Sequence, residues 1–223
     1  SDDRHDLPAM AAAINDRTRL VLVCNPNNPT GAGVTTAELD EFMALVPSDV
    51  LVVVDEAYVH FNDDPNSADG LDFFNRYENV AVLHTFSKAY GLAGLRIGYA
   101  IARVDVAENL RRVAVPFGVS SLAQQAAIAS LDAEAELDER VQVIVAERAR
   151  MIEELRGRGW TVREALGNFV WLRTGERTPE IDAVLREHAV IARAYGTDGI
   201  RVTIGSAEMN DRFLAAIAGV EAT

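Results

Sequence analysis

The chain has 223 residues, and its 21 lysines and arginines against 34 aspartates and glutamates give a formal net charge of −13. Apolar residues make up 49% and charged residues 25%, which excludes a disordered or collagen-like chain. The negative charge disfavours nucleic acid and anionic membranes as partners, and no apolar run approaches the roughly 20 residues that span a bilayer. Cys24 is the single cysteine, so it forms no internal disulfide, and we expect a reducing, cytoplasmic location.

Short apolar runs alternate with helical patterns along the first half of the chain. The predicted strands are residues 20–23, 50–54, 80–83 and 96–101. Their apolarity is continuous rather than alternating, which is typical of a mainly parallel sheet with helices on both faces. Thr35 and Glu38 have the spacing of a capping box, and they predict a helix that ends before Pro47.

The pattern between the two halves is helical. Ser121 and Gln124 open a helix that runs to about Leu131, and the pattern then stays helical to about Arg156 without Pro or Gly. We interpret this second stretch as a connection between two domains, because it is far longer than an average helix.

Strands and helices become shorter after this stretch. The predicted strands are residues 160–162, 169–172, 190–192 and 200–204, and helices begin near Thr178 and Ser206. We therefore expect three parts: residues 1–131 in a large domain, 132–157 as a connecting helix, and 158–223 as a small α/β domain.

Polar clusters follow three of the predicted strands, in residues 25–31, 55–58 and 85–88. The carboxyl ends of parallel strands share one edge of a sheet, so these clusters meet in one cleft. A lysine there, Lys88, can form an imine because desolvation favours its neutral form. Nearby hydroxyls and Arg96 suit a phosphate, and Asp55 suits a ring cation. A ligand with a carbonyl, a cationic ring and a phosphate is pyridoxal phosphate. The set has no metal-ligand spacing.

These clusters resemble the signatures of the class I and II pyridoxal-phosphate-dependent aminotransferases. The resemblance rests on residues 25–31, 55–58 and 85–98, and residues 199–205 resemble the C-terminal signature of the branch with histidinol-phosphate and aromatic amino-acid aminotransferases. It runs from about Leu7 to the end of the chain. It implies the fold-type I transferase fold, an α/β fold whose large domain has a mainly parallel sheet with helices on both faces, followed by a small C-terminal α/β domain.

The resemblance assigns the contacts with the cofactor ring. Lys88 matches the lysine that forms an imine with pyridoxal 5'-phosphate and later shuttles the proton. Asp55 matches the carboxylate that keeps the pyridine nitrogen protonated. Asn28 and Tyr58 match the amide and the phenol that contact the ring hydroxyl oxygen.

It also assigns the phosphate and substrate ligands. Thr85, Ser87 and Arg96 match ligands of the cofactor phosphate. Arg201 matches the arginine that binds the substrate α-carboxylate, and Arg193 matches a position that meets the distal group of the substrate. A further substrate residue implied by the resemblance is Asn168.

The implied function is ping-pong transfer of an amino group between an aromatic amino acid or histidinol phosphate and a 2-oxo acid, with 2-oxoglutarate and glutamate as the second pair. The segment 116–121 slightly favours aromatic substrates over histidinol phosphate. The family also implies a homodimer, and the histidinol-phosphate alternative would place the protein in histidine biosynthesis. A decarboxylase or carbon–sulfur lyase of the same fold would share Lys88, Asp55 and Asn28. A dinucleotide-binding loop is disfavoured, because Thr36 stands where a third glycine is needed.

The family normally carries a region ahead of the part that resembles Leu7 onwards. That region supplies a phosphate loop, an aromatic residue on the other ring face and a tyrosine that reaches across the dimer. The 223 residues do not include it, so we expect the sequence to be part of a longer protein. The remaining alternative is a non-catalytic fragment.

Overall fold

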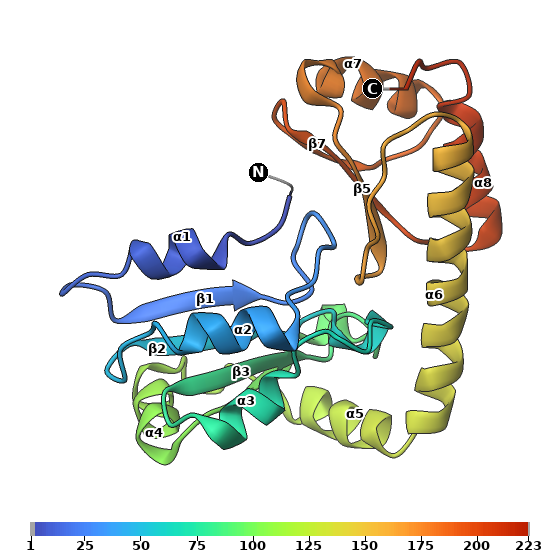
Figure 1. The fold of residues 1–223 in the computed structure, drawn as a ribbon. Helices are drawn as coiled ribbons and strands as arrows, with labels where there is room; N and C mark the ends of the chain where they lie inside the picture. Colours follow the sequence, from blue (N-terminus) through green and yellow to red (C-terminus); the bar gives the residue numbers. More distant parts are fainter. Residues whose placement is uncertain (1–2, 223) are drawn as a thin grey trace.

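The computed structural model describes residues 3–222, which form two sheets joined by the long helix α6 (Glu134–Gly157) (Figure 1). The first sheet contains β1 (Leu20–Cys24), β2 (Leu51–Asp55), β3 (Val80–Thr85) and β4 (Gly98–Ile101), in that order. The first three strands are parallel, and β4 runs antiparallel to β3. The carboxyl ends of β1, β2 and β3 therefore meet at one edge of the sheet, as the sequence predicts.

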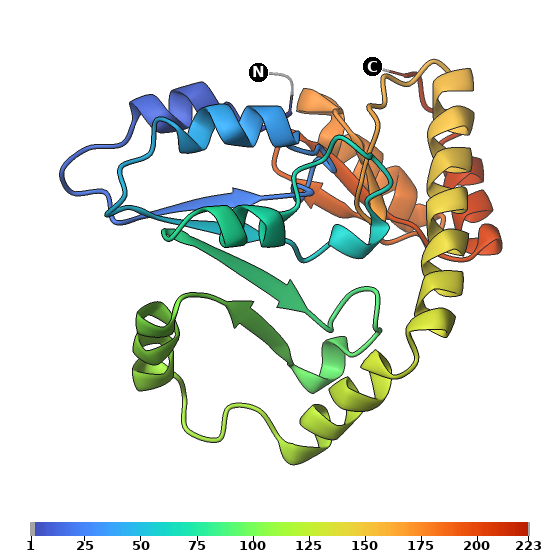
Figure 2. The ribbon, with the colours of Figure 1, turned by 60° about the horizontal axis from the view of Figure 1, so that its bottom comes forward.

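One face of this sheet packs on the first three helices, α1 (Leu7–Ala12), α2 (Thr36–Met43) and α3 (Gly70–Arg76). The core between them consists of residues from both layers: Val23, Val52, Val54, Val80 and Val82 from the strands, with Leu7, Leu39, Phe42, Met43 and Phe73 from the helices. Figure 2 shows α4 (Val104–Val113) and α5 (Ser121–Leu131) on the other side. Leu20 and Leu22 of β1 point away from α1 and α2 and are about half exposed.

The second sheet belongs to the C-terminal part of the chain. Its strands are β5 (Phe169–Leu172), β7 (Gly199–Thr203) and β6 (Arg193–Tyr195), in the spatial order β5-β7-β6 with antiparallel pairing. The C-terminal half of α6, together with α7 (Thr178–Glu187) and α8 (Ala207–Ala216), packs on one face. Three short 3-10 turns complete the fold: η1 (Val59–Phe61), η2 (Ala93–Leu95) and η3 (Gly175–Arg177).

Helix termini follow the local sequence closely. Thr35 and Glu38 form the predicted capping box, in which the Thr35 hydroxyl accepts from the Glu38 amide and the Glu38 carboxylate accepts from the Thr35 amide. Helix α5 begins at Ser121 and ends at Leu131, as predicted, and its cap is Ser120, whose hydroxyl accepts from the Ala123 amide at 3.1 Å. Ser206 caps α8 as expected. No helix among residues 3–222 is long and apolar enough to span a membrane.

Two predicted strands are wrong. Trp160 and Val162 are buried, but residues 160–162 form no ladder, because Gly159 turns the chain with φ of +88° and the Trp160 amide donates to Leu155 of the preceding helix. Residues 190–192 also form no ladder with the second sheet, since the Val190 amide donates to the Leu185 carbonyl at the end of α7. The edge strand starts at Arg193 instead, which places Arg193 directly opposite Arg201.

Truncation of Phe73 tests the packing of α3. Phe73 is fully buried against the first sheet, so Phe73→Ala should lower the free energy of unfolding by about 3–5 kcal/mol. Leu71, on the same helix, is 37% exposed, and Leu71→Ala should cost about 0.5 kcal/mol. Urea unfolding of both variants measures the difference. Equal losses would contradict this placement of α3.

Candidate active site

Asp55 lies at the carboxyl end of β2, beside the end of β3. It is half-buried, and its Oδ1 accepts from the Ala57 amide at 3.2 Å. Within residues 3–222 no cationic side chain pairs with this carboxylate. A carboxylate that is partly removed from water without a protein cation is costly, so its position suits a cationic ligand.

Lys88 lies in the loop after β3, and its side chain reaches back towards β2. Its Nζ is 5.2 Å from the ring centroid of Tyr58, which follows Asp55 by three residues. Tyr58 is only 4% exposed, and its ring contacts Phe169 of the second sheet edge-on, with the centroids 5.0 Å apart. The structure therefore places the predicted amine and phenol together, against a residue of the C-terminal part.

The predicted phosphate ligands lie at the end of β3 and in the loop that follows it. The Thr85 hydroxyl accepts from the Ser87 amide at 3.1 Å, which folds the chain tightly after β3. Arg96 is exposed and has a left-handed backbone with φ of +52°, a conformation that is costly for a residue other than glycine. Its guanidinium donates to the Ala93 carbonyl at 2.7 Å.

Arg201 joins the second sheet to the edge of the first. Its Nη1 donates to Oδ1 of Asn28 at 2.6 Å, and its Cζ is 5.0 Å from the Phe169 ring centroid. Its Nε is buried and has no hydrogen-bond partner in the described part of the chain. Because Asn28 uses its oxygen for this contact, its amide NH₂ stays available as a donor. A buried donor without a partner indicates that the Arg201 Nε–H is available to bind an acceptor atom of a ligand.

Arg193 and Asn168 flank Arg201. Arg193 and Arg201 are direct partners in the β6–β7 ladder, so both side chains leave the same face of the sheet. Arg193 is exposed, with its Cζ 5.4 Å from the Tyr195 ring. Asn168 is half-buried at the start of β5, and its carbonyl accepts from the Ile204 amide at 2.9 Å.

A buried pair supports the ends of β2 and β3 from behind. Glu56 is 2% exposed; its Oε1 accepts from the Gly70 amide and its Oε2 contacts Nε2 of His84, both at 2.7 Å. These bonds give Glu56 and His84 a structural role. Burial raises the pKa of the neighbouring Cys24 thiol, so Cys24 behaves as a small apolar residue.

Sequence reasoning missed two residues near this edge. Phe169 lies between Tyr58 and Arg201, although as part of an apolar run it looks like an ordinary strand residue. Arg148 is buried in α6, although one arginine among many charged helix residues is typical of a solvated face. Only a three-dimensional contact distinguishes either residue from its neighbours.

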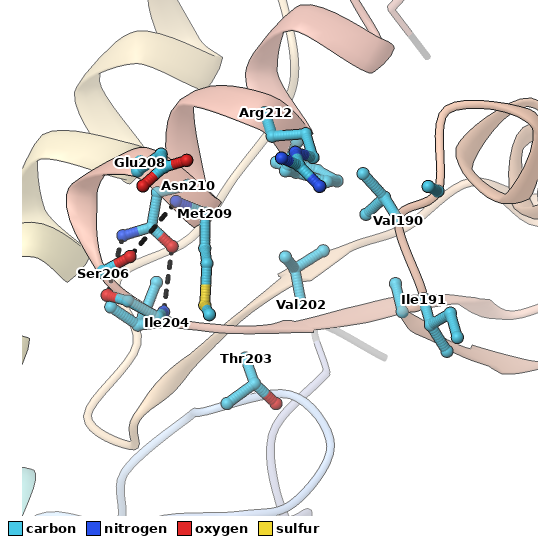
Figure 3. Close-up of a pocket in the computed structure, with 14 residues that line it drawn as sticks. Val190, Ile191, Val202, Thr203, Ile204, Ser206, Glu208, Met209, Asn210 and Arg212 are labelled. Carbon is cyan, nitrogen blue, oxygen red and sulfur yellow. Dashed lines mark hydrogen bonds between the residues drawn. The ribbon is translucent and has the colours of Figure 1, made fainter.

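Two cavities border the second sheet on opposite faces. One, of about 540 Å³, lies on the Arg201 face between Pro29, Thr30, Trp171 and Tyr195. The other, of about 480 Å³, lies between β7 and α8 and has a mainly apolar lining, which includes Val202, Ile204 and Met209 (Figure 3). Val202 and Arg201 point to opposite faces because successive strand residues alternate. The second cavity is therefore separate from the residues described above.

The residues at the sheet edge fit pyridoxal phosphate. Asp55 offers a carboxylate without a protein cation, Asn28 a free amide donor, and Lys88 an amine beside Tyr58. The loop after β3 adds hydroxyls and Arg96 for a phosphate. Among residues 3–222, no three His, Cys, Asp or Glu side chains are grouped for a metal ion.

Comparisons with known proteins identify the family. The family model for aminotransferase class I and II matches residues 1–217. An aromatic amino acid aminotransferase from Streptomyces avermitilis is 58% identical over 212 residues, or 95% of this chain and 59% of that protein. The chain thus spans about three fifths of that relative's length.

Solved structures give the same result for the fold. The histidinol-phosphate aminotransferase from Sinorhizobium meliloti, in complex with pyridoxal-5'-phosphate, is 29% identical with a TM-score of 0.87, covering 99% of this chain and 62% of that one. The histidinol-phosphate aminotransferase from Clostridium acetobutylicum is 25% identical with a TM-score of 0.89, covering 99% and 69%. These likenesses confirm the predicted fold-type I architecture. With a family match over nearly its whole length, the chain belongs to the class I and II aminotransferases.

Proposed function

We propose that the protein containing this chain is a pyridoxal-phosphate-dependent aminotransferase that moves an amino group between an aromatic amino acid and a 2-oxo acid. The observation that carries the proposal is the 2.6 Å bond between Arg201 and Asn28. This bond holds the Arg201 guanidinium, which can bind a carboxylate, next to the edge of the first sheet where Asp55 and Lys88 lie. The likeness to named aromatic amino acid aminotransferases supports the same reading.

Each residue then has a chemical task. Pyridoxal phosphate, when bound, supplies a carbonyl that captures amines and a ring that accepts electrons. Asp55 holds a proton on the ring nitrogen, and Asn28 and Tyr58 hold the ring oxygen. With the cofactor bound, the Lys88 amine would accept the proton from the substrate α-carbon and return it to the cofactor carbon that is bonded to the same nitrogen. The remaining residues bind anions, with Arg96, Thr85 and Ser87 on the phosphate.

Arg201 orients the substrate, because its planar fork matches the two oxygens of a carboxylate. The cavity beside Trp171 and Tyr195 supports an aromatic substrate side chain. Asn168, which directly precedes β5, is a further candidate for contact with the substrate. Arg193, in register with Arg201, favours substrates that carry a second anion. This suits 2-oxoglutarate as the acceptor, and it keeps histidinol phosphate, with a place in histidine biosynthesis, as the second candidate donor.

Assembly and organisation are part of the proposal. Five apolar side chains from α4 to α5 are exposed within ten residues: Val113, Val115, Phe117, Val119 and Leu122. Such a patch supports a protein–protein contact, and we infer a homodimer in the cytoplasm. We also propose that residues 1–131 and 158–223 act as large and small domains, joined by residues 132–157.

Borohydride reduction tests the function directly. The full-length protein should absorb as a protein-bound pyridoxal imine, and reduction should fix the cofactor to Lys88, as read by peptide mass mapping. Phenylalanine should then exchange its amino group only when a 2-oxo acid is supplied. A phosphopyridoxyl group on another residue would contradict the site. Turnover without a 2-oxo acid would point instead to a decarboxylase or carbon–sulfur lyase.

A further inference from the structure

Arg148 is a buried cation in the middle of the connecting helix. Its side chain is 4% exposed. Its Nη1 donates to the carbonyls of Phe61 and Gly167, at 2.7 and 2.9 Å, and its Nη2 donates to Asp63 at 2.6 Å. One guanidinium therefore joins two segments that lie about a hundred residues apart in the sequence.

Each of these segments leads to one side of the candidate site. Phe61 follows Tyr58 through the short turn η1. Gly167 precedes Phe169, and it leaves no room for a side chain because a Cβ there would lie 2.9 Å from the Phe169 ring. The Phe169 ring contacts both the Tyr58 ring and the Arg201 guanidinium, and its centroid is 5.0 Å from the Tyr58 centroid and from the Arg201 Cζ. A shift of Gly167 would move Phe169 and with it the distance between Tyr58 and Arg201.

The hydrogen bonds of Arg148 fix the distance between the Phe61 and Gly167 segments. A buried arginine is tolerated only when its donors are satisfied. Here two of the acceptors are backbone carbonyls, one from Phe61 at the end of η1 and one from Gly167 in the segment before β5. Burial lowers the pKa of Arg148, and the charge of Asp63 offsets part of that effect. Loss of the fork leaves two buried carbonyls without a donor, which favours separation of the two segments.

We propose that Arg148 is a positioning residue that sets the distance between the cofactor side and the carboxylate-binding side of the site. It contacts neither ligand. By holding the Phe61 and Gly167 carbonyls together, it keeps Phe169 between Tyr58 and Arg201, and so keeps Arg201 at the place where a substrate carboxylate arrives. This inference rests on the proposed function, and it adds a residue that determines selectivity for substrates with a carboxylate.

Three variants of the full-length protein separate positioning from general stability. Arg148→Met keeps the length of the side chain and removes every donor. Arg148→Lys keeps the charge but not the fork, and should lie between Arg148→Met and the wild type. The matched control is Arg150→Met on the same helix, which removes ion pairs with Glu147 and Asp211 but touches neither segment.

The first measurement is the ratio of kcat/KM for phenylalanine to kcat/KM for 2-phenylethylamine, which lacks the carboxylate. Both values come from one preparation, so the folded fraction cancels. Arg148→Met should lower the ratio by about tenfold or more, since a misplacement near 1 Å can cost that much. Arg150→Met should leave it unchanged. An unchanged ratio in Arg148→Met would overturn the inference.

The second measurement does not depend on activity. The Leu166 amide donates to Gly31 and the Ile204 amide to Asn168, at 2.8 and 2.9 Å, so both report on the segment around Gly167. In Arg148→Met without cofactor, their hydrogen exchange should be about tenfold faster, while the Val52 amide in the first sheet stays protected. Uniformly faster exchange would assign Arg148 to global stability and reject positioning. A wild type that reacts with neither substrate would overturn the proposed function, and the exchange result would then still decide whether Arg148 holds this segment.

Discussion

Asp55→Asn should retain the cofactor and lose most of its turnover. The carboxylate accepts from the Ala57 amide and faces no protein cation within the described residues, so its charge is left to hold a proton on the ring nitrogen. A pair of opposite charges at about 4 Å contributes roughly 4 kcal/mol at an effective dielectric constant near 20. If that contribution is lost in the transition state, kcat falls by about 10³-fold.

The matched variant is Tyr58→Phe. It removes one hydroxyl and keeps the ring that packs on Phe169, so it should lower kcat by about tenfold or less. Single-turnover reaction with phenylalanine, together with cofactor absorbance, measures binding and turnover separately. Equal losses in the two variants would mean that the charge of Asp55 has no special role.

Arg201→Lys should be almost as damaging as Arg201→Ala. Lysine keeps the charge but cannot bind both carboxylate oxygens in one plane, and it also loses the contact with Asn28. Each charged hydrogen bond contributes roughly 1.5–3 kcal/mol, so kcat/KM for phenylalanine should fall by about 10²-fold. The same loss should appear with phenylpyruvate, because donor and acceptor present a carboxylate to the same side chain.

The amine 2-phenylethylamine is the control for both Arg201 variants. It has no carboxylate, so its kcat/KM should change by less than about threefold. If amine and amino acid lose equally, Arg201 supports the fold and does not bind the substrate. Arg148→Met should lower the ratio of kcat/KM for phenylalanine to kcat/KM for 2-phenylethylamine, as Arg201→Lys does, but by a smaller factor.

Much of the sheet edge could be predicted from the sequence. Residues 20–24, 51–55 and 80–85 are short, apolar and β-branched, and each is followed by polar residues. Parallel pairing brings such ends together whatever the rest of the chain does. Family resemblance then supplied roles that spacing alone could not, because a strand-end lysine is usually a solvated lysine.

Strand pairing in the C-terminal part was harder to predict. Residues 190–192 are apolar and suggest a strand, yet they extend from the end of α7 without a partner. Arg193, polar and exposed, begins the real edge strand. The apolar, β-branched residues of a segment indicate that it is buried. They do not indicate whether a neighbouring strand is in position to form hydrogen bonds with it. Arg148 shows the same limit, since its burial depends on two carbonyls far away in the sequence.

The alignment of Arg193 with Arg201 matters for how the protein is handled in solution. Two guanidinium groups opposite each other on one sheet face repel, and an anion that bridges them relieves the repulsion. Phosphate and sulfate buffers should therefore compete with substrates for this pair. Dissolved salt screens exposed charges over a Debye length of about 8–10 Å, so affinity for doubly charged acceptors should fall as ionic strength rises. Zwitterionic buffers of low ionic strength leave the two arginines free for the substrate alone.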